Sequence, residues 1–223
     1  MKKFNLLGTA EKLVRDVSLR SGINKSDNIK LAKQFGFEYF DGSRDQGYGG
    51  YHYDGRWVPV AKKIIGRYEL SAGSRFLDVG CAKGFLLKDI SDINPKIELY
   101  GLDVSSYAIK HAPEEIKPFI RQGNCKQLPF PNDYFDAVVA INTIHNLPYK
   151  ECIRSIKELI RVTKNKENIF LQVDAYTDER ELDLFKQWVL TAETYLPIHG
   201  WIELFEKCNY KGDYFWTIIG FEQ

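Results

Sequence analysis

The chain has 223 residues, of which 44% are hydrophobic and 14% aromatic, so it can bury the core of one domain with an elaboration. Its 31 basic and 30 acidic side chains leave a formal net charge of +1, which argues against a nucleic-acid partner held by an overall basic field. Four scattered cysteines without a Cys-x-x-Cys pair, and the lack of an apolar run of about 18 residues, predict a cytoplasmic protein with reduced thiols, no metal site and no membrane span.

Residues 1–70 are expected to form a helical extension and possible lid ahead of a core domain of residues 71–223. Apolar residues at helical spacing after Thr9 predict a first helix, and a second short helix is expected over residues 26–36. Such helices either pack on the edge of the core or cover a ligand. For the first helix we favour packing.

Residues 41–57 show neither the periodicity of an amphipathic helix nor that of a strand and are expected to form a loop. The loop contains five glycines, three tyrosines and a tryptophan, although large rings in a loop need something to cover. The rings either fill the junction between helix and sheet or face a ligand, and both alternatives stay open. Arg56 in this loop is expected to bind a carboxylate.

The rest of the chain alternates between β and α patterns, which is typical of an α/β fold with a largely parallel sheet. Strands are expected at residues 75–80, 98–104, 118–122, 135–142, 169–174 and 213–221. Helices are expected at residues 57–68, 84–93, 105–112, 148–160, 179–190 and 201–208.

The first of these strands runs into a glycine turn and then a helix, a pattern that places a ligand at the carboxyl end of the strand. Asp103 ends the next strand about 20 residues later, where a ribose-binding carboxylate is expected. Ala82 and Phe85 stand where a dinucleotide fingerprint needs glycine, which argues against NAD. An adenosine-containing cofactor without a pyrophosphate fits this pattern.

The spacing Asp78-x-Gly80-x-Ala82-x-Gly84 resembles motif I of the class I S-adenosylmethionine-dependent methyltransferases. Residues 122–136 are similar to that family's segment between its third and fourth strands, and the resemblance covers roughly residues 70 to 175. It implies a Rossmann-like three-layer sandwich with a mostly parallel sheet and an antiparallel strand at the C-terminal end. Because little chain follows Gly212, six or seven strands are expected.

The resemblance also implies the cofactor, S-adenosylmethionine, and the residues that hold it. Asp103 would bind the ribose, and Asn124, where most members carry an acid, would meet the adenine amino group. The expected cofactor-binding residues are Asp78, Gly80, Cys81, Ala82, Gly84, Asp103, Val104, Asn124, Cys125 and Ile141, together with Arg56.

Polar residues follow the fourth core strand at the edge where the cofactor is expected. His145 is the leading candidate for a general base, the alternative being a histidine that bonds to loop backbone, and His199 is a second candidate. The expected substrate-binding residues are Tyr48, Tyr51, Trp57, Asn142, Tyr195 and Trp201.

These features predict methyl transfer from S-adenosylmethionine to an oxygen or nitrogen atom of a small polar molecule, such as a sugar or polysaccharide precursor. The alternatives are an RNA or protein methyltransferase and a non-catalytic domain that keeps the fold for binding. The intact motif argues against the last of these, and the oligomeric state is left open.

Overall fold

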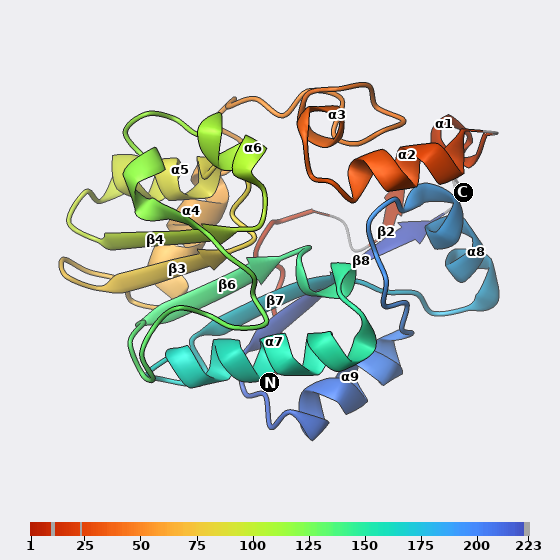
Figure 1. Cartoon of the computed structure of the whole chain (residues 1–223). Coiled ribbons are helices and arrows are strands. Elements are labelled where there is room, and N and C mark those ends of the chain that lie inside the picture. The colour runs from red at the N-terminus through yellow and green to blue at the C-terminus, as the bar shows by residue number, and fades with distance from the viewer. Residues whose placement is uncertain (10–11, 23, 221–223) are drawn as a thin grey trace.

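The computed structural model describes residues 1–9, 12–22 and 24–220, and it shows a parallel sheet between two layers of helices (Figure 1). Within the described residues the sheet has eight strands: β1 (Lys2–Lys3), β2 (Lys12–Val14), β3 (Arg75–Val79), β4 (Glu98–Asp103), β5 (Ile120–Gln122), β6 (Ala137–Ile141), β7 (Ile169–Asp174) and β8 (Asp213–Gly220). The order across the sheet is β1-β8-β7-β6-β3-β4-β5, and β2 also pairs with β8. This confirms the expected Rossmann-like α/β architecture, with one strand more than the expected range.

The helices cover both faces of the sheet. They are α1 (Ser18–Ser21), α2 (Lys25–Ala32), α3 (Phe37–Phe40), α4 (Val58–Arg67), α5 (Phe85–Ile93), α6 (Ser106–Lys110), α7 (Tyr149–Val162), α8 (Glu179–Trp188) and α9 (Ile198–Lys207), with 3-10 turns at Lys117–Phe119 and Ile144–Asn146. Alternate residues of each central strand point to opposite faces, so α7 and α9 share one apolar core and α4 and α5 share the other. The central strands are therefore buried on both faces, as parallel strands usually are.

The expected antiparallel C-terminal strand is wrong, because β8 runs parallel to β7, with Phe170 opposite Asp213. The chain crosses back through α9 before it re-enters the sheet, and such a crossover returns a strand in the same direction. The outer edge of β8 is paired by β1 and β2, also in parallel. The two N-terminal segments β1 and β2 therefore cover this edge of the sheet.

The first expected helix, after Thr9, is also wrong. Residues 12–14 form a strand whose Leu13 lies opposite Ile219 of β8, while residues 10 and 11 lie outside the described part of the chain. Hydrogen bonds offered by the open edge of β8 outweigh a weak helical periodicity. The second expected helix is confirmed as α2.

The N-terminal segment belongs to the same core as the central sheet. Leu6 and Ile64 are fully buried in one apolar cluster with Phe76 of β3 and Phe170 of β7. The proposed division at residue 70 stays a prediction, but the two parts share one sheet and one core.

Candidate functional site

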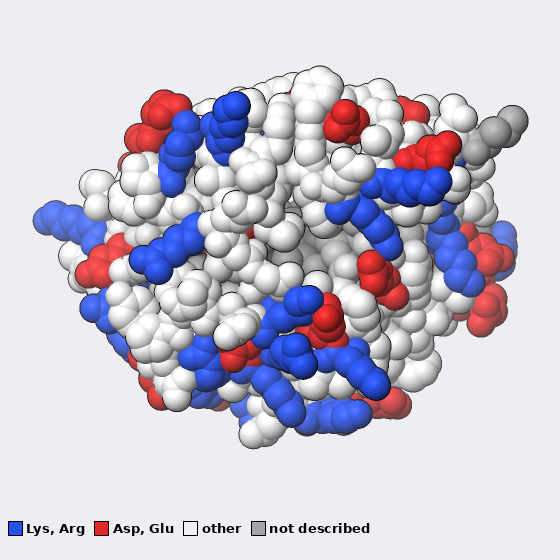
Figure 2. Space-filling model, viewed as in Figure 1, with Lys and Arg blue, Asp and Glu red and all other residues white. Residues whose placement is uncertain are grey.

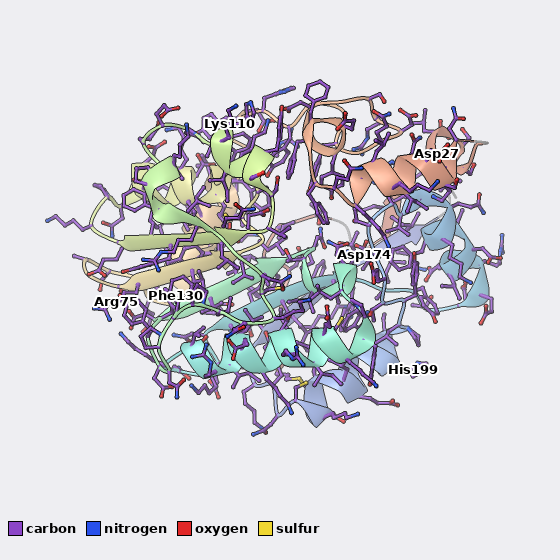
Figure 3. All side chains as sticks on the ribbon, in the orientation of Figure 1. Asp27, Arg75, Lys110, Phe130, Asp174 and His199 are labelled. Atoms are coloured by element: carbon purple, nitrogen blue, oxygen red, sulfur yellow. The ribbon has the colours of Figure 1, made fainter. Side chains whose placement is uncertain are left out.

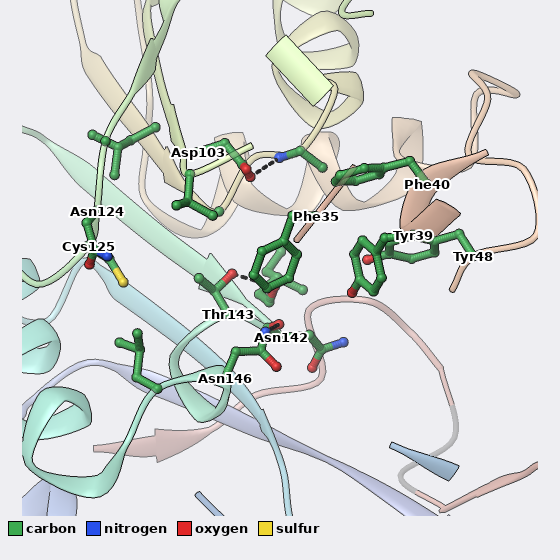
Figure 4. Close-up of a pocket in the computed structure, with 17 residues that line it drawn as sticks. Phe35, Tyr39, Phe40, Tyr48, Asp103, Asn124, Cys125, Asn142, Thr143 and Asn146 are labelled. Carbon is green, nitrogen blue, oxygen red and sulfur yellow. Dashed lines mark hydrogen bonds between the residues drawn. The ribbon is translucent and has the colours of Figure 1, made fainter. Parts of the chain in front are cut away.

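A pocket lies at the carboxyl ends of β3, β4 and β6, with Phe35, Tyr39 and Phe40 along one side (Figure 4). The same face of the molecule is hollowed near its centre (Figure 2). The lining residues are Phe35, Tyr39, Phe40, Tyr48, Gly80, Ala82, Leu102, Asp103, Val104, Gly123, Asn124, Cys125, Ile141, Asn142, Thr143, Asn146 and Leu147. Seven of the eleven residues expected to bind the cofactor are among them, so the pocket lies at the edge of the sheet that the glycine turn indicated.

The glycine turn brings the ends of two strands into close contact. Gly80 has φ of +79°, and a Cβ there would lie 2.1 Å from Oγ1 of Thr143, which follows β6. Any side chain at residue 80 would push β6 away from the turn. Ala82 also has a positive φ, +51°, and its N–H donates to Oδ2 of Asp103 at 2.7 Å.

Asp103 is held by backbone donors and faces the pocket. Its Oδ1 accepts from the Ser105 N–H at 2.8 Å and its Oδ2 from the Ala82 N–H, so each oxygen keeps a free lone pair. Burial raises the pKa of Asp103, although the N–H groups of Ser105 and Ala82 oppose the rise. The carboxylate is thus oriented for further donors such as ligand hydroxyls.

Asp78 lies below the turn and does not line the pocket. The side chain is 5% exposed and accepts no hydrogen bond from any residue that the structure describes. Burial and then the nearby charge of Asp103 raise the pKa of Asp78 to about 8. Asp78 is therefore largely neutral near pH 7, and Asp103 is the carboxylate at this end of the pocket that can favour a cationic ligand.

Asn124 and Cys125 lie together at the other end of the pocket (Figure 4). Oδ1 of Asn124 accepts from the Lys126 N–H at 2.9 Å, which leaves it one lone pair for a ligand. The Cys125 N–H has no acceptor within the described ranges. This end offers the donor and the acceptor that an adenine edge requires.

Besides Asp78, three other residues expected to bind the cofactor do not line the pocket: Cys81, Gly84 and Arg56. Cys81 is buried in the core, and a Cβ on Gly84 would lie 2.7 Å from the Ile120 side chain, so Gly84 allows α5 to pack closely. Arg56 pairs with Asp54 at 2.6 Å on the surface, and this pairing raises the pKa of Arg56. As placed, Arg56 binds its own loop rather than a cofactor carboxylate.

The pocket has an aromatic wall, formed by Phe35, Tyr39, Phe40 and Tyr48. In Figure 4, Phe35 lies between Asp103 and Asn142, and the other three rings lie beside it. The Phe35 carbonyl accepts from the Ser105 hydroxyl at 2.6 Å, which joins the wall to the end of β4. Of these four rings only Tyr48 was predicted from the sequence, and the signal for the other three was the aromatic-rich stretch of residues 35–40.

A buried ion pair ties the aromatic wall to the glycine turn. The Lys83 Nζ lies 2.7 Å from both carboxylate oxygens of Asp41 and donates to the Tyr51 carbonyl at 2.7 Å. Asp41 also accepts from the Tyr107 hydroxyl and from the Tyr51 N–H. Burial alone would raise the pKa of Asp41, but the bonds from Lys83 and Tyr107 hold it below its usual value. This network was not expected from the sequence.

The other residues expected to bind the substrate lie partly at or behind the pocket and partly in the core. Asn142 lines the pocket, and Tyr51 lies behind Tyr48, with ring centroids 4.7 Å apart. The other three do not line the pocket: Trp57 packs between two apolar clusters, Tyr195 lies against Phe185, and Trp201 is fully buried beneath the sheet.

His145 is buried, with both ring nitrogens directed to Asp174. Nδ1 accepts from the Asp174 N–H at 3.2 Å, and Nε2 lies 3.4 Å from Oδ2 of Asp174. Burial lowers the pKa of His145, and the Asp174 charge opposes this. His145 does not line the pocket, and His199 is exposed on α9 at the outside of the molecule (Figure 3).

Among the described residues, no group of three His, Cys, Asp or Glu side chains is arranged to hold a metal ion. In the same part of the chain, no helix has the length and apolar character needed to cross a membrane.

Residues 77–171 match the family model of the methyltransferase domain. The demethylmenaquinone methyltransferase of Geobacillus kaustophilus is 32% identical over 116 residues, which cover 49% of this chain and 49% of that protein. Its counterpart in Staphylococcus carnosus is 29% identical over 161 residues, which cover 70% of this chain and 63% of that protein. The chain thus spans about half to under two thirds of the length of these relatives.

Solved structures show the same fold. The YcgJ protein of Bacillus subtilis superposes with a TM-score of 0.55 at 21% identity, covering 66% of each chain. A protein of Bacillus halodurans C-125 that has been assigned as a methyltransferase gives a TM-score of 0.53 at 18% identity, covering 66% of this chain and 67% of that one.

Proposed function

We propose that the chain, whose residues 77–171 match the methyltransferase-domain family model, is a class I methyltransferase that transfers the methyl group of S-adenosylmethionine to an oxygen or nitrogen atom of a small polar molecule. The observation that carries the proposal is the Asp103 carboxylate, which two backbone N–H groups orient toward the pocket while each oxygen keeps a lone pair.

The pocket suits this cofactor at both ends. Asp103 would accept hydrogen bonds from the two ribose hydroxyls, and Asn124 with the Cys125 N–H would meet the adenine edge. The carboxylate of Asp103 would also favour the positive charge of the methionine part. When bound, S-adenosylmethionine supplies an electrophilic methyl group on a sulfonium centre.

The chain's own contribution is to position the acceptor and to exclude water. The aromatic wall closes one side of the pocket, and Asn142 and Asn146 add polar groups beside it. Holding donor and acceptor in line provides much of the rate in such a transfer. An acceptor that must lose a proton also needs a base. The role of His145 as that base stays a prediction; in the structure both its ring nitrogens lie against Asp174.

The acceptor itself is proposed as a class. The two relatives named above are demethylmenaquinone methyltransferases by name, and the aromatic wall of this chain, at residues 35 to 48, lies outside the domain of residues 77–171 that matches the family model. A small polar molecule such as a sugar precursor fits the polar groups of Asn142 and Asn146 beside this wall. Methylation of RNA or protein remains the alternative.

Calorimetry with S-adenosylhomocysteine tests the cofactor site. We expect Asp103→Ala to weaken binding by about 1–3 kcal/mol, because ligand hydroxyls would lose their acceptor. Asp92→Ala, which removes an exposed acid from α5, is the matched control and should bind like the wild type. No heat of binding in the wild type, or equal affinity in a folded Asp103→Ala variant, would count against the proposal.

A further inference from the structure

Three arginines gather on one tryptophan beside the aromatic wall. The guanidinium carbons of Arg15, Arg20 and Arg44 lie 5.6, 4.0 and 5.1 Å from the ring centroid of Trp188. They come from the turn after β2, from α1 and from the loop after α3, and Trp188 ends α8. Within the described residues none of the three forms an ion pair with a carboxylate.

Attraction to the ring does not explain this arrangement. Each cation gains roughly 0.5–2 kcal/mol from an aromatic ring, but three like charges around one ring repel each other. The repulsion is visible at Arg20, where burial and then Arg44 lower the pKa to about 10. A bound anion would relieve it.

Arg20 has a structural role within the cluster. Its side chain is 8% exposed and donates to the backbone carbonyls of Arg44, Gly47 and Trp188. These bonds fix the loop after α3 against the end of α8, so the position of Arg20 follows from the fold. Its charge nevertheless adds to the field of the cluster.

Arg15 and Arg44 keep donors for a ligand. Both side chains are exposed, and Arg44 uses only Nη1, toward the carbonyls of Gly47 and Tyr48. In the parts of the chain that the structure describes, Nε and Nη2 of Arg44 and all the nitrogens of Arg15 make no hydrogen bond. Guanidinium groups of this kind bind carboxylate or phosphate through two parallel bonds.

The cluster lies outside the pocket but is joined to two of its lining residues, Tyr48 and Asn146. Arg44 bonds directly to the backbone of Tyr48, a residue of the aromatic wall. On the other side, Thr191, three residues after Trp188, donates to the Oδ1 of Asn146, which also lines the pocket. Arg15 lies near enough to Asp174 to influence its carboxyl, yet the two form no ion pair.

We infer that Arg15 and Arg44, backed by Arg20, bind an oxyanion carried by the methyl acceptor, either a phosphate or a carboxylate. The inference rests on the proposed function, because it assigns the anion to the acceptor of that site. It narrows the acceptor from a small polar molecule to an anionic one.

The experiment is a calorimetric titration of the protein saturated with S-adenosylhomocysteine. Inorganic phosphate and acetate are the two probes, each at an ionic strength held constant with chloride, and the tighter of the two identifies the kind of oxyanion. We expect Arg15→Gln and Arg44→Gln each to weaken binding of that probe at least about tenfold, since each removes charge-assisted hydrogen bonds. Arg154→Gln, an exposed arginine on α7, is the matched control and should bind like the wild type.

The outcomes separate this inference from the proposed function. Failure of the wild type to bind S-adenosylhomocysteine counts against the proposed function. Normal binding of S-adenosylhomocysteine without binding of either anion overturns the anion site alone. Equal anion affinity in the wild type, Arg15→Gln and Arg44→Gln, or equal weakening by Arg154→Gln, also overturns it.

Discussion

Replacement of Lys83 by methionine tests whether the buried ion pair holds the aromatic wall on the glycine turn. The Lys83 side chain is 7% exposed and that of Asp41 is 23% exposed. Breaking a buried pair costs about 3–5 kcal/mol when one charge is left unpaired. Because Asp41 keeps some solvent and the donors of Tyr51 and Tyr107, we expect Lys83→Met to lower the free energy of unfolding by about 2–3 kcal/mol.

The assay is urea unfolding at pH 7 and at pH 5, with two companion variants. Lys88→Met, on the helix α5 that follows the glycine turn, removes a lysine that pairs with carboxylates 54% and 58% exposed, so it should cost under about 1 kcal/mol. The double variant Asp41→Asn with Lys83→Met removes both charges but keeps an acceptor for Tyr51 and Tyr107. It should be more stable than Lys83→Met alone.

The pH dependence gives a second check. In the wild type the pKa of Asp41 is lowered, so its contribution is present above the unfolded value of about 4 and is lost as pH falls through the folded value. Without Lys83, burial should raise that pKa, and protonation near pH 5 should relieve part of the cost. A Lys83→Met variant as stable as the wild type at pH 7, with unchanged affinity for S-adenosylhomocysteine, would refute the role of this pair.

Two further changes test the buried carboxyl and the N-terminal segment. The raised pKa of Asp78, about 8, means that the folded state keeps a proton that the unfolded state has lost, so stability should fall as pH rises from about 4 to 8. Asp78→Asn should flatten this fall in urea unfolding, and parallel curves for the two proteins would contradict it. Leu6→Ala should lower the free energy of unfolding by about 2–4 kcal/mol because Leu6 is fully buried, whereas Leu19→Ala, at a side chain 50% exposed, should change it little. Equal small effects would mean that the N-terminal segment does not belong to the core.

The central β/α units could be predicted from sequence because their local signals agree with the fold. The strand at residues 169–174 was placed to the residue, and the glycine turn and Asp103 placed the pocket. A strand covered on both faces appears in the sequence as a continuous apolar run. Few residues other than glycine adopt a positive φ, so a glycine turn is also visible in the sequence.

The parts that failed depend on partners far away in the chain. Lys12–Val14 becomes a strand only because β8 offers an open edge, and the direction of β8 follows from the path through α9. The aromatic wall escaped notice because the rings of Phe35 and Tyr39 resemble ordinary core residues until the sheet edge opposite them is known. The assignment of His145 as a base stays a prediction, and its orientation could not be predicted because it is set by Asp174 on the neighbouring strand.

The pairing of β1 and β2 with β8 also affects how the protein can fold during synthesis. Lys2 lies beside Asp213 in the finished sheet, and a ribosome adding about 5–20 residues per second needs roughly 10 to 40 s to pass from one to the other. Throughout that interval, the first residues and the edge of β7 lack the strand that joins them. Exposed strand edges invite pairing with other chains, so the nascent protein should be most prone to aggregation until residues 213–220 have emerged.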